Sequence, residues 1–232
     1  NTHPTVTHNH TETKLMAELQ RQASQFIIRT FPVGPLQCNC SVIGDRVSKK
    51  ALVIDPGGDA DYILALLKEL QLTVVGIIHT HAHLDHILAS GEIKAATGAP
   101  IYLHEGDKFL WDMVEEQCVR FGVPKVTLPE PDYFMHDDQD LNCCGGVAIH
   151  TPGHTPGSIS FWFEEYKTLI AGDTLFLGGV GRTDLPGGNF DQIITSIKER
   201  IYSLDDEAVV VTGHGPNTSI GNEKANNGFV RA

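Results

Sequence analysis

The heptapeptide THAHLDH (residues 80–86) places three imidazoles and one carboxylate within six positions. It follows TVVGII (residues 73–78), whose β-branched and apolar side chains are typical of a buried strand. In an extended loop, His81 and His83 project to the same side. Asp85 and His86 come where the next helix is expected to begin, and their neighbouring side chains diverge. We therefore expect this loop to serve two adjacent metals, with the first pair on one metal and the second pair on the other.

The donor types in this loop narrow the choice of metal. Imidazole and carboxylate donors suit zinc, iron or manganese rather than a soft thiolate site. Two other interpretations stay open from the residues alone. Asp85 would serve equally as the cap of the following helix, and one of the histidines as a hydrogen-bonded core residue.

Three further segments supply the remaining donors. TPGHTPGS (residues 151–158) places His154 in a turn between two predicted strands, and AGDTLF (residues 171–176) places Asp173 just after a strand. GHGP (residues 213–216) places His214 after the last strand. Catalytic groups are often mounted at such positions. Seven donors, with Asp173 able to bridge, would give each of two metals several protein ligands and leave positions open for water.

Two other polar residues lie beside predicted strands. His79 ends the strand before the histidine-rich loop, so it is expected to pack or to donate a hydrogen bond that orients a ligand. Asp55, in IDPGG, either orients the ligand loop or only starts a turn.

The elements around these motifs alternate along the chain. Helical spacing predicts helices over 59–70, 87–97, 106–121 and 190–202. Short apolar runs predict strands over 26–31, 40–44, 51–55, 73–78, 100–104, 147–151, 158–163, 168–172 and 208–213. With no linker between them, one α/β domain is expected from about 25 to 232, after a flexible polar tail and a short helix over residues 1–24.

Composition argues against two classes of partner. The formal net charge of −12 disfavours nucleic-acid binding, which depends on Lys and Arg contacts to phosphates. No run approaches the roughly 20 apolar residues of a membrane span.

The five cysteines are odd in number and lack the Cys-x-x-Cys spacing of a structural zinc site, so reduced thiols in a cytoplasmic protein are expected.

Taken in order, THAHLDH, TPGHTPGS, GDTLF, GHGP and the loop GGVGRTDLPGG (residues 178–188) resemble the metallo-β-lactamase superfamily, in particular its glyoxalase II (hydroxyacylglutathione hydrolase) branch. The resemblance runs from about residue 26 onward and implies an αββα four-layer sandwich with its metals at one edge. It also implies a distribution of ligands. His81, His83 and His154 would bind the first metal, Asp85, His86 and His214 the second, and Asp173 would bridge them.

The resemblance further implies a reaction. A short, single-domain glyoxalase II-like enzyme would hydrolyse S-D-lactoylglutathione or a related 2-hydroxyacyl thioester with a hydroxide generated by two divalent metals. Zinc is the expected metal, and iron or manganese would fit the same ligands. Asp85 would orient the nucleophile, and Arg182 would contact the glutathione moiety or, alternatively, only stabilise its loop. Only 18 residues follow His214, fewer than the helical C-terminal domain of the long glyoxalase II type.

Rival functions share much of this pattern. A persulfide dioxygenase would use a single iron and oxygen, and it shares sequence like GRTD after the bridging Asp. A lactonase or β-lactamase would use the same metals on another acyl group, although no cysteine near GDTLF matches the cysteine-containing lactamases. A metal-binding scaffold without activity would be expected to lack one or more ligands, whereas all seven are present.

Overall fold

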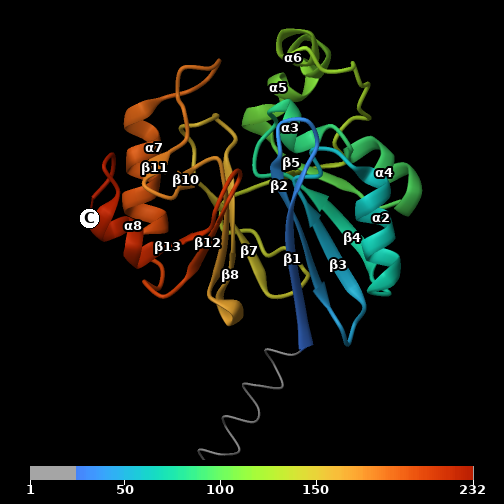
Figure 1. Ribbon diagram of the computed structural model, residues 1–232, viewed down its shortest axis with the longest axis horizontal. Helices are drawn as coiled ribbons and strands as arrows, with labels where there is room; N and C mark the ends of the chain where they lie inside the picture. The colour runs from blue at the N-terminus through green and yellow to red at the C-terminus, as the bar shows by residue number, and fades with distance from the viewer. Residues whose placement is uncertain (1–24, 232) are drawn as a thin grey trace, which may run out of the picture.

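Two β-sheets pack against each other and carry helices on their outer faces, which confirms the predicted αββα sandwich (Figure 1). This computed structural model describes residues 25–231, so the tail and helix predicted for residues 1–24 lie outside the described part. No helix within 25–231 combines the length and the apolar character needed to cross a membrane.

The first sheet has six strands in sequence order. Its first three strands are antiparallel neighbours, and β3 to β6 run parallel. The strands are β1 (Phe26–Val33), β2 (Cys38–Asp45), β3 (Lys50–Ile54), β4 (Thr73–Ile78), β5 (Ile101–His104) and β6 (Tyr133–Met135).

The second sheet has five strands in the order β13-β12-β9-β8-β7. Only β12 and β9 are parallel, and the other pairs are antiparallel. The strands are β7 (Gly146–His150), β8 (Ile159–Phe163), β9 (Thr168–Gly172), β12 (Val209–Thr212) and β13 (Thr218–Ser219), with a separate hairpin of β10 (Leu175–Phe176) and β11 (Gly179–Val180).

Helices cover both outer faces of the sandwich. In Figure 1, α2 and α4 lie against the first sheet, and α7 and α8 lie against the second. The helices are α2 (Ala60–Glu69), α3 (Leu84–Ile87), α4 (Ser90–Thr97), α5 (Lys108–Asp112), α6 (Val114–Phe121), α7 (Phe190–Ser196) and α8 (Ile220–Asn226). Shorter turns are η1 (Glu105–Asp107), η2 (Glu164–Tyr166) and the π-helical η3 (Ile197–Ile201).

Strand alternation builds three apolar layers from the two sheets. In β3, Ala51 and Val53 join the cluster under α2 and α4, whereas Leu52 and Ile54 face the second sheet. In β9, the side chain of Ile170 enters the layer between the sheets, and its neighbours pack under α7. Sheets buried on both faces need strands without polar alternation, which accounts for runs such as TVVGII.

The predicted helices differ in detail from the observed ones. The helix expected over 87–97 starts earlier and divides into α3 and α4, and the one over 106–121 breaks at Met113 between α5 and α6. The helix over 190–202 ends in the π-helical turn η3. The sequence does not indicate the strands β6, β10, β11 and β13, because two or three strand residues are too few to show alternation. It does not indicate α8 either, because seven residues are fewer than the window over which helical periodicity is recognised.

The direction of the strands brings the candidate ligand loops to one edge of the sandwich. The loops after β3, β4 and β5 leave the same end of the parallel part of the first sheet. In the second sheet, β9 and β12 are parallel, and β8 starts beside the end of β9. The segments with Asp173, His214 and His154 therefore share an edge.

The layer between the sheets should carry much of the stability. Phe161 is fully buried there, so Phe161→Ala should lower the free energy of unfolding by about 3–5 kcal/mol through lost burial and a cavity. Urea unfolding of metal-saturated protein measures this loss. Val47→Ala, at a side chain that is 76% exposed, is the control and should change the value by less than about 0.5 kcal/mol. A loss below about 1 kcal/mol for Phe161→Ala would contradict this packing.

Candidate metal centre

Asp55 anchors the histidine-rich loop from the end of β3. Its carboxylate is buried and accepts hydrogen bonds from the Thr80 backbone N–H (2.7 Å) and the Thr80 hydroxyl (2.6 Å). Its Oδ2 atom also lies 3.0 Å from Nδ1 of His86. Of the two roles open for Asp55 from the sequence, the structure supports that of orienting the ligand loop.

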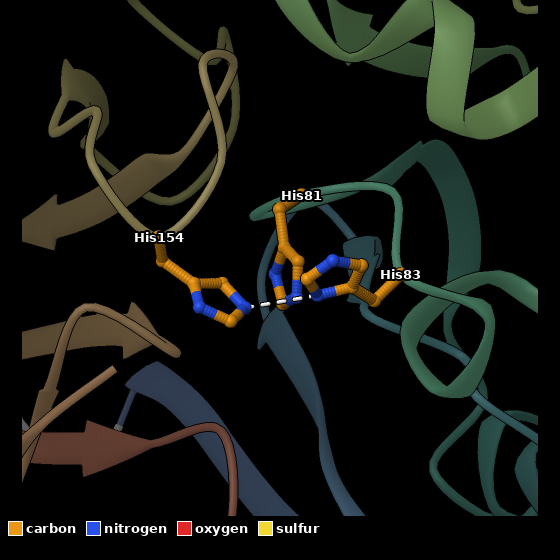
Figure 2. A group of neighbouring side chains, drawn as sticks. All are labelled: His81, His83 and His154. Carbon is orange, nitrogen blue, oxygen red and sulfur yellow. Dashed lines mark hydrogen bonds between the residues drawn. The ribbon is translucent and has the colours of Figure 1, made fainter. Parts of the chain in front are cut away.

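Three histidines form the first group of candidate ligands (Figure 2). One nitrogen from each of His81, His83 and His154 lies within 4.8 Å of the others. His83 Nδ1 and His154 Nε2 are 2.9 Å apart, and His154 Nδ1 donates to the backbone carbonyl of Arg182 at 2.7 Å. This second bond orients the ring of His154, because it leaves Nε2 to face the other two histidines.

Asp85, His86 and His214 form a second group, again within 4.8 Å. His214 Nε2 lies 3.0 Å from a carboxylate oxygen of Asp85. Asp173 stands between the two groups, since its Oδ1 is 3.5 Å from His86 Nε2 and its Oδ2 is 3.6 Å from His154 Nε2. The fold therefore brings together all seven residues that the sequence singled out as ligands.

Two motif glycines allow this crowding. A Cβ atom on Gly213, next to His214, would lie 1.9 Å from Oδ1 of Asp173. A Cβ atom on Gly57, in the IDPGG segment, would lie 1.5 Å from the backbone oxygen of Asp85. Any larger residue at either position would push a candidate ligand segment away.

Several buried polar atoms in this cluster have no hydrogen-bond partner among residues 25–231. They are Nε2 of His81, Nε2 of His83, Nε2 of His86 and Oδ1 of Asp173. Leaving such an atom buried without a partner costs about 1–3 kcal/mol. For His86, Nδ1 faces Asp55 and the orphaned Nε2 lies toward Asp85 and Asp173. Divalent cations held by these groups would satisfy Nε2 of His81, Nε2 of His86 and Oδ1 of Asp173, so the residues fit a metal centre. His83 would bind through Nδ1, the atom that faces His154.

The local electrostatics favour neutral rings in the first group. Burial is the main cause that lowers the pKa of His83 to about 3 and the pKa of His81 well below its usual value. Both rings are therefore neutral near pH 7, as metal binding requires.

Neighbouring carboxylates dominate the electrostatics of the second group. Burial acts to lower the pKa of His86, but Cys38 and the surrounding carboxylates raise it well above the usual value. Its hydrogen bond to Asp85 raises the pKa of His214. Burial disfavours ionisation of Asp85 and Asp173, yet the neighbouring histidines lower the pKa of both carboxyls. The ionised carboxylates of Asp85 and Asp173 would attract a divalent cation, which would replace the proton held by His86.

Two residues that the sequence analysis did not single out hold the ligand loops in place. Asp107, in η1, accepts from the Ala82 N–H (3.0 Å), the Thr155 hydroxyl (2.8 Å) and the Gly157 N–H (2.6 Å). It therefore joins the loop of His81 and His83 to the loop of His154.

Gln117, on α6, fixes the same loop from another side. Its Oε1 accepts from the Leu84 N–H (3.0 Å), and its Nε2 donates to the carbonyls of Ala82 (3.1 Å) and Leu110 (2.8 Å). Neither Gln117 nor Asp107 lies in a motif, and only the tertiary contacts reveal their role.

The remaining predicted residues have separate surroundings. Arg182 makes a two-pronged ion pair with Asp184 (2.7 and 2.8 Å), and its side chain is 58% exposed. This pairing lowers the pKa of the Asp184 carboxyl to about 2. His79 bonds to Ser90 and to the backbone of Tyr102, away from the candidate ligands. Asp85 makes no side-chain cap for α3, so the alternative role of a helix cap is wrong.

The five cysteines are free and buried, and none belongs to the metal-ligating groups among residues 25–231. Cys38 lies 3.3 Å from Nδ1 of His86, on the side away from the other ligands. Burial raises the pKa of the Cys38 thiol to about 12, so it stays protonated.

Known proteins resemble this chain in sequence and in fold. Hydroxyacylglutathione hydrolase GloC of Haemophilus influenzae is 39% identical over 209 residues, which cover 88% of this chain and 98% of GloC. The structure of BLEG-1, a B3 metallo-beta-lactamase, superimposes with a TM-score of 0.82 at 36% identity and covers 89% of this chain and 100% of that one. TTHA1623 in a di-iron-bound form gives 0.81 at 34% identity, with 87% and 100% covered.

The sequence profile of the metallo-beta-lactamase superfamily matches residues 33–214, a span that begins at the end of β1 and ends on the last candidate ligand, His214. With its two-sheet sandwich and its histidine and aspartate cluster at one edge, the chain belongs to the metallo-beta-lactamase superfamily.

Proposed function

We propose that this protein is a glyoxalase II-type thioesterase that hydrolyses S-D-lactoylglutathione or a related 2-hydroxyacyl thioester. The observation that carries the proposal is the pair of adjacent ligand groups with Asp173 between them. The similarity to GloC over nearly the full length of that protein supports a thioester substrate. The five reduced, buried thiols support a cytoplasmic location.

In this proposal each ligand group holds one divalent ion. The three histidines of Figure 2 hold the first, and Asp85, His86 and His214 hold the second. When bound, such ions supply a water of lowered pKa and polarise a carbonyl oxygen. Zinc is the expected ion, and the di-iron form of TTHA1623 supports iron as the alternative.

The protein's own groups then position the reactants. The Asp85 carboxylate is fixed by His214 and stays ionised, so it can hold the attacking water by a hydrogen bond and accept its proton. Asp55 keeps the His86 ring in a fixed orientation, and Asp107 keeps the two histidine loops together. The protein thus supplies a rigid, preorganised site rather than a nucleophile of its own.

A β-lactamase-type activity is the second candidate, because BLEG-1 is similar over 89% of this chain. A panel assay separates the functions. Metal-saturated protein is given S-D-lactoylglutathione, a chromogenic cephalosporin and glutathione persulfide, with thiol release, β-lactam opening and oxygen uptake as readouts. Thiol release with the highest kcat/KM supports the proposal. Faster β-lactam opening, or oxygen uptake with the persulfide, would reject it.

Asp85→Asn should lower kcat by about 10²- to 10⁴-fold, because the amide cannot accept the proton of the attacking water. Steady-state kinetics on the thioester measure the effect, and circular dichroism checks folding. The control is Asp61→Asn, at an exposed carboxylate in the first turn of α2. Near-normal turnover of Asp85→Asn would remove this residue from the mechanism.

His154→Ala should reduce the bound metal by about one equivalent, since it deletes a donor of the first group. Elemental analysis after dialysis measures the stoichiometry. His136→Ala is the matched control, because His136 is exposed and belongs to neither group. Unchanged metal content in His154→Ala would exclude this histidine as a ligand.

Arg182→Ala should raise KM for glutathione thioesters by about twofold to tenfold and leave small thioesters unaffected, if the guanidinium leaves Asp184 to bind the carrier. The comparison uses the same acyl group on glutathione and on N-acetylcysteamine. Arg46→Ala, an exposed position after β2 at the opposite end of the sheet, is the control. Equal effects on both carriers would leave Arg182 as a loop-stabilising residue only.

A further inference from the structure

A cavity of about 220 Å³ lies directly beside the candidate metal centre. His83 joins the two, because it belongs to the first ligand group and also lines the cavity. One wall comes from α5 and α6, and the other comes from Leu185 and Pro186 in the loop that follows Arg182. A group bound in this cavity would therefore lie against His83, a member of the first ligand group.

The lining of this cavity is mainly apolar. Its apolar members are Leu110, Met113, Phe121, Leu185 and Pro186. The side chains of Met113 and Phe121 are 40% and 42% exposed, so large apolar surfaces face solvent next to the centre. Covering such surface with an apolar ligand is favourable, whereas the polar backbone of a peptide-like thiol would lose hydrogen bonds to water there.

The polar residues of the lining offer a charged ligand neither a free side-chain amide nor a net opposite charge. Gln117 already uses its amide on the backbone of Ala82, Leu84 and Leu110. Glu116 and Arg120 carry opposite charges one helical turn apart on α6, so their fields largely cancel for a ligand between them. An uncharged occupant fits this lining best.

His83 is the residue at which the cavity and the first ligand group meet. Its Nδ1 faces His154, so this atom would hold the metal, and Nε2 would carry the ring proton. An acyl group in the cavity would therefore lie against this ring, next to the first ligand group.

The volume limits the size of the occupant. Whole small-molecule ligands need cavities of about 300–1,000 Å³, so this cavity suits only a part of a thioester. At about 30 Å³ per water-sized group, 220 Å³ holds about seven heavy atoms. The lactoyl group extends only three heavy atoms beyond its carbonyl carbon and would leave most of the space empty.

We propose that this cavity is an acyl-binding site that selects 2-hydroxyacyl thioesters with uncharged apolar chains longer than lactoyl. The proposal rests on the proposed thioesterase function and names the substrate class of the same centre. Met113 and Phe121 are its specificity-determining residues, and they act through contact with the chain.

Binding and turnover test the proposal separately. S-alkylglutathiones from methyl to octyl cannot be hydrolysed, and their affinity for the metal-loaded protein is measured by calorimetry. Affinity should rise about fourfold per methylene up to about six carbons and then level off. The kcat/KM of S-(2-hydroxyacyl)glutathiones with three to eight carbons should follow the same trend.

Two variants should shift the preferred chain length in opposite directions. Met113→Trp fills the cavity and should favour shorter chains, and Phe121→Ala enlarges it and should favour longer ones. Val119→Ala is the matched control, because Val119 is on the same helix, 63% exposed and outside the lining.

The possible outcomes separate this proposal from the proposed function. Affinity that does not change with chain length, or variants that leave the preferred length unchanged, would overturn the acyl site. Length-dependent binding without hydrolysis of any thioester would uphold the cavity as an alkyl-binding site and overturn the thioesterase function. Best turnover of the lactoyl substrate would overturn the proposed selectivity alone.

Discussion

Buried imidazole and carboxylate atoms without hydrogen-bond partners are the constraint on which this structure depends. Burial keeps His81 and His83 neutral and leaves ring nitrogens of both without a partner among the described residues. Each such atom destabilises the fold unless a cation or a ligand satisfies it. The centre therefore contains donor atoms that a bound cation would satisfy, beside the ionised carboxylates of Asp85 and Asp173. Binding of metal and stability of the fold should be linked for this reason.

A set of buried polar residues behind the ligands makes this arrangement rigid. Asp55 secures the loop after β4 and the ring of His86, whereas Asp107 ties that loop to the turn of His154. Gln117 connects the same loop to α6. These contacts join segments that are 25 to 50 residues apart in the chain. A preorganised site of this kind lowers the cost of arranging water and substrate for reaction.

The same contacts link the metal centre to the surface that would select the substrate. Because Gln117 connects α6 to the ligand loop, the apolar cavity and His83 keep a fixed relation to each other. The opposite wall, at Leu185 and Pro186, follows directly on the loop whose Arg182 carbonyl orients His154. The candidate metal centre and the proposed acyl-binding cavity are therefore built from adjacent parts of the same loops. Changes in α6 or in the 182–186 loop would alter specificity without removing a ligand.

The sequence by itself determined the candidate ligand residues and the fold class. Closely spaced His and Asp residues next to apolar strands indicate metal ligands, and strands buried on both faces show as continuous apolar runs. Tertiary structure alone decided which distant segments meet, because hydrogen bonds such as those of Asp107 and Gln117 leave no periodic pattern in the chain. It also decided the cavity beside His83. This cavity depends on how segments that follow different sheets approach each other, and local residue preferences do not encode that distance.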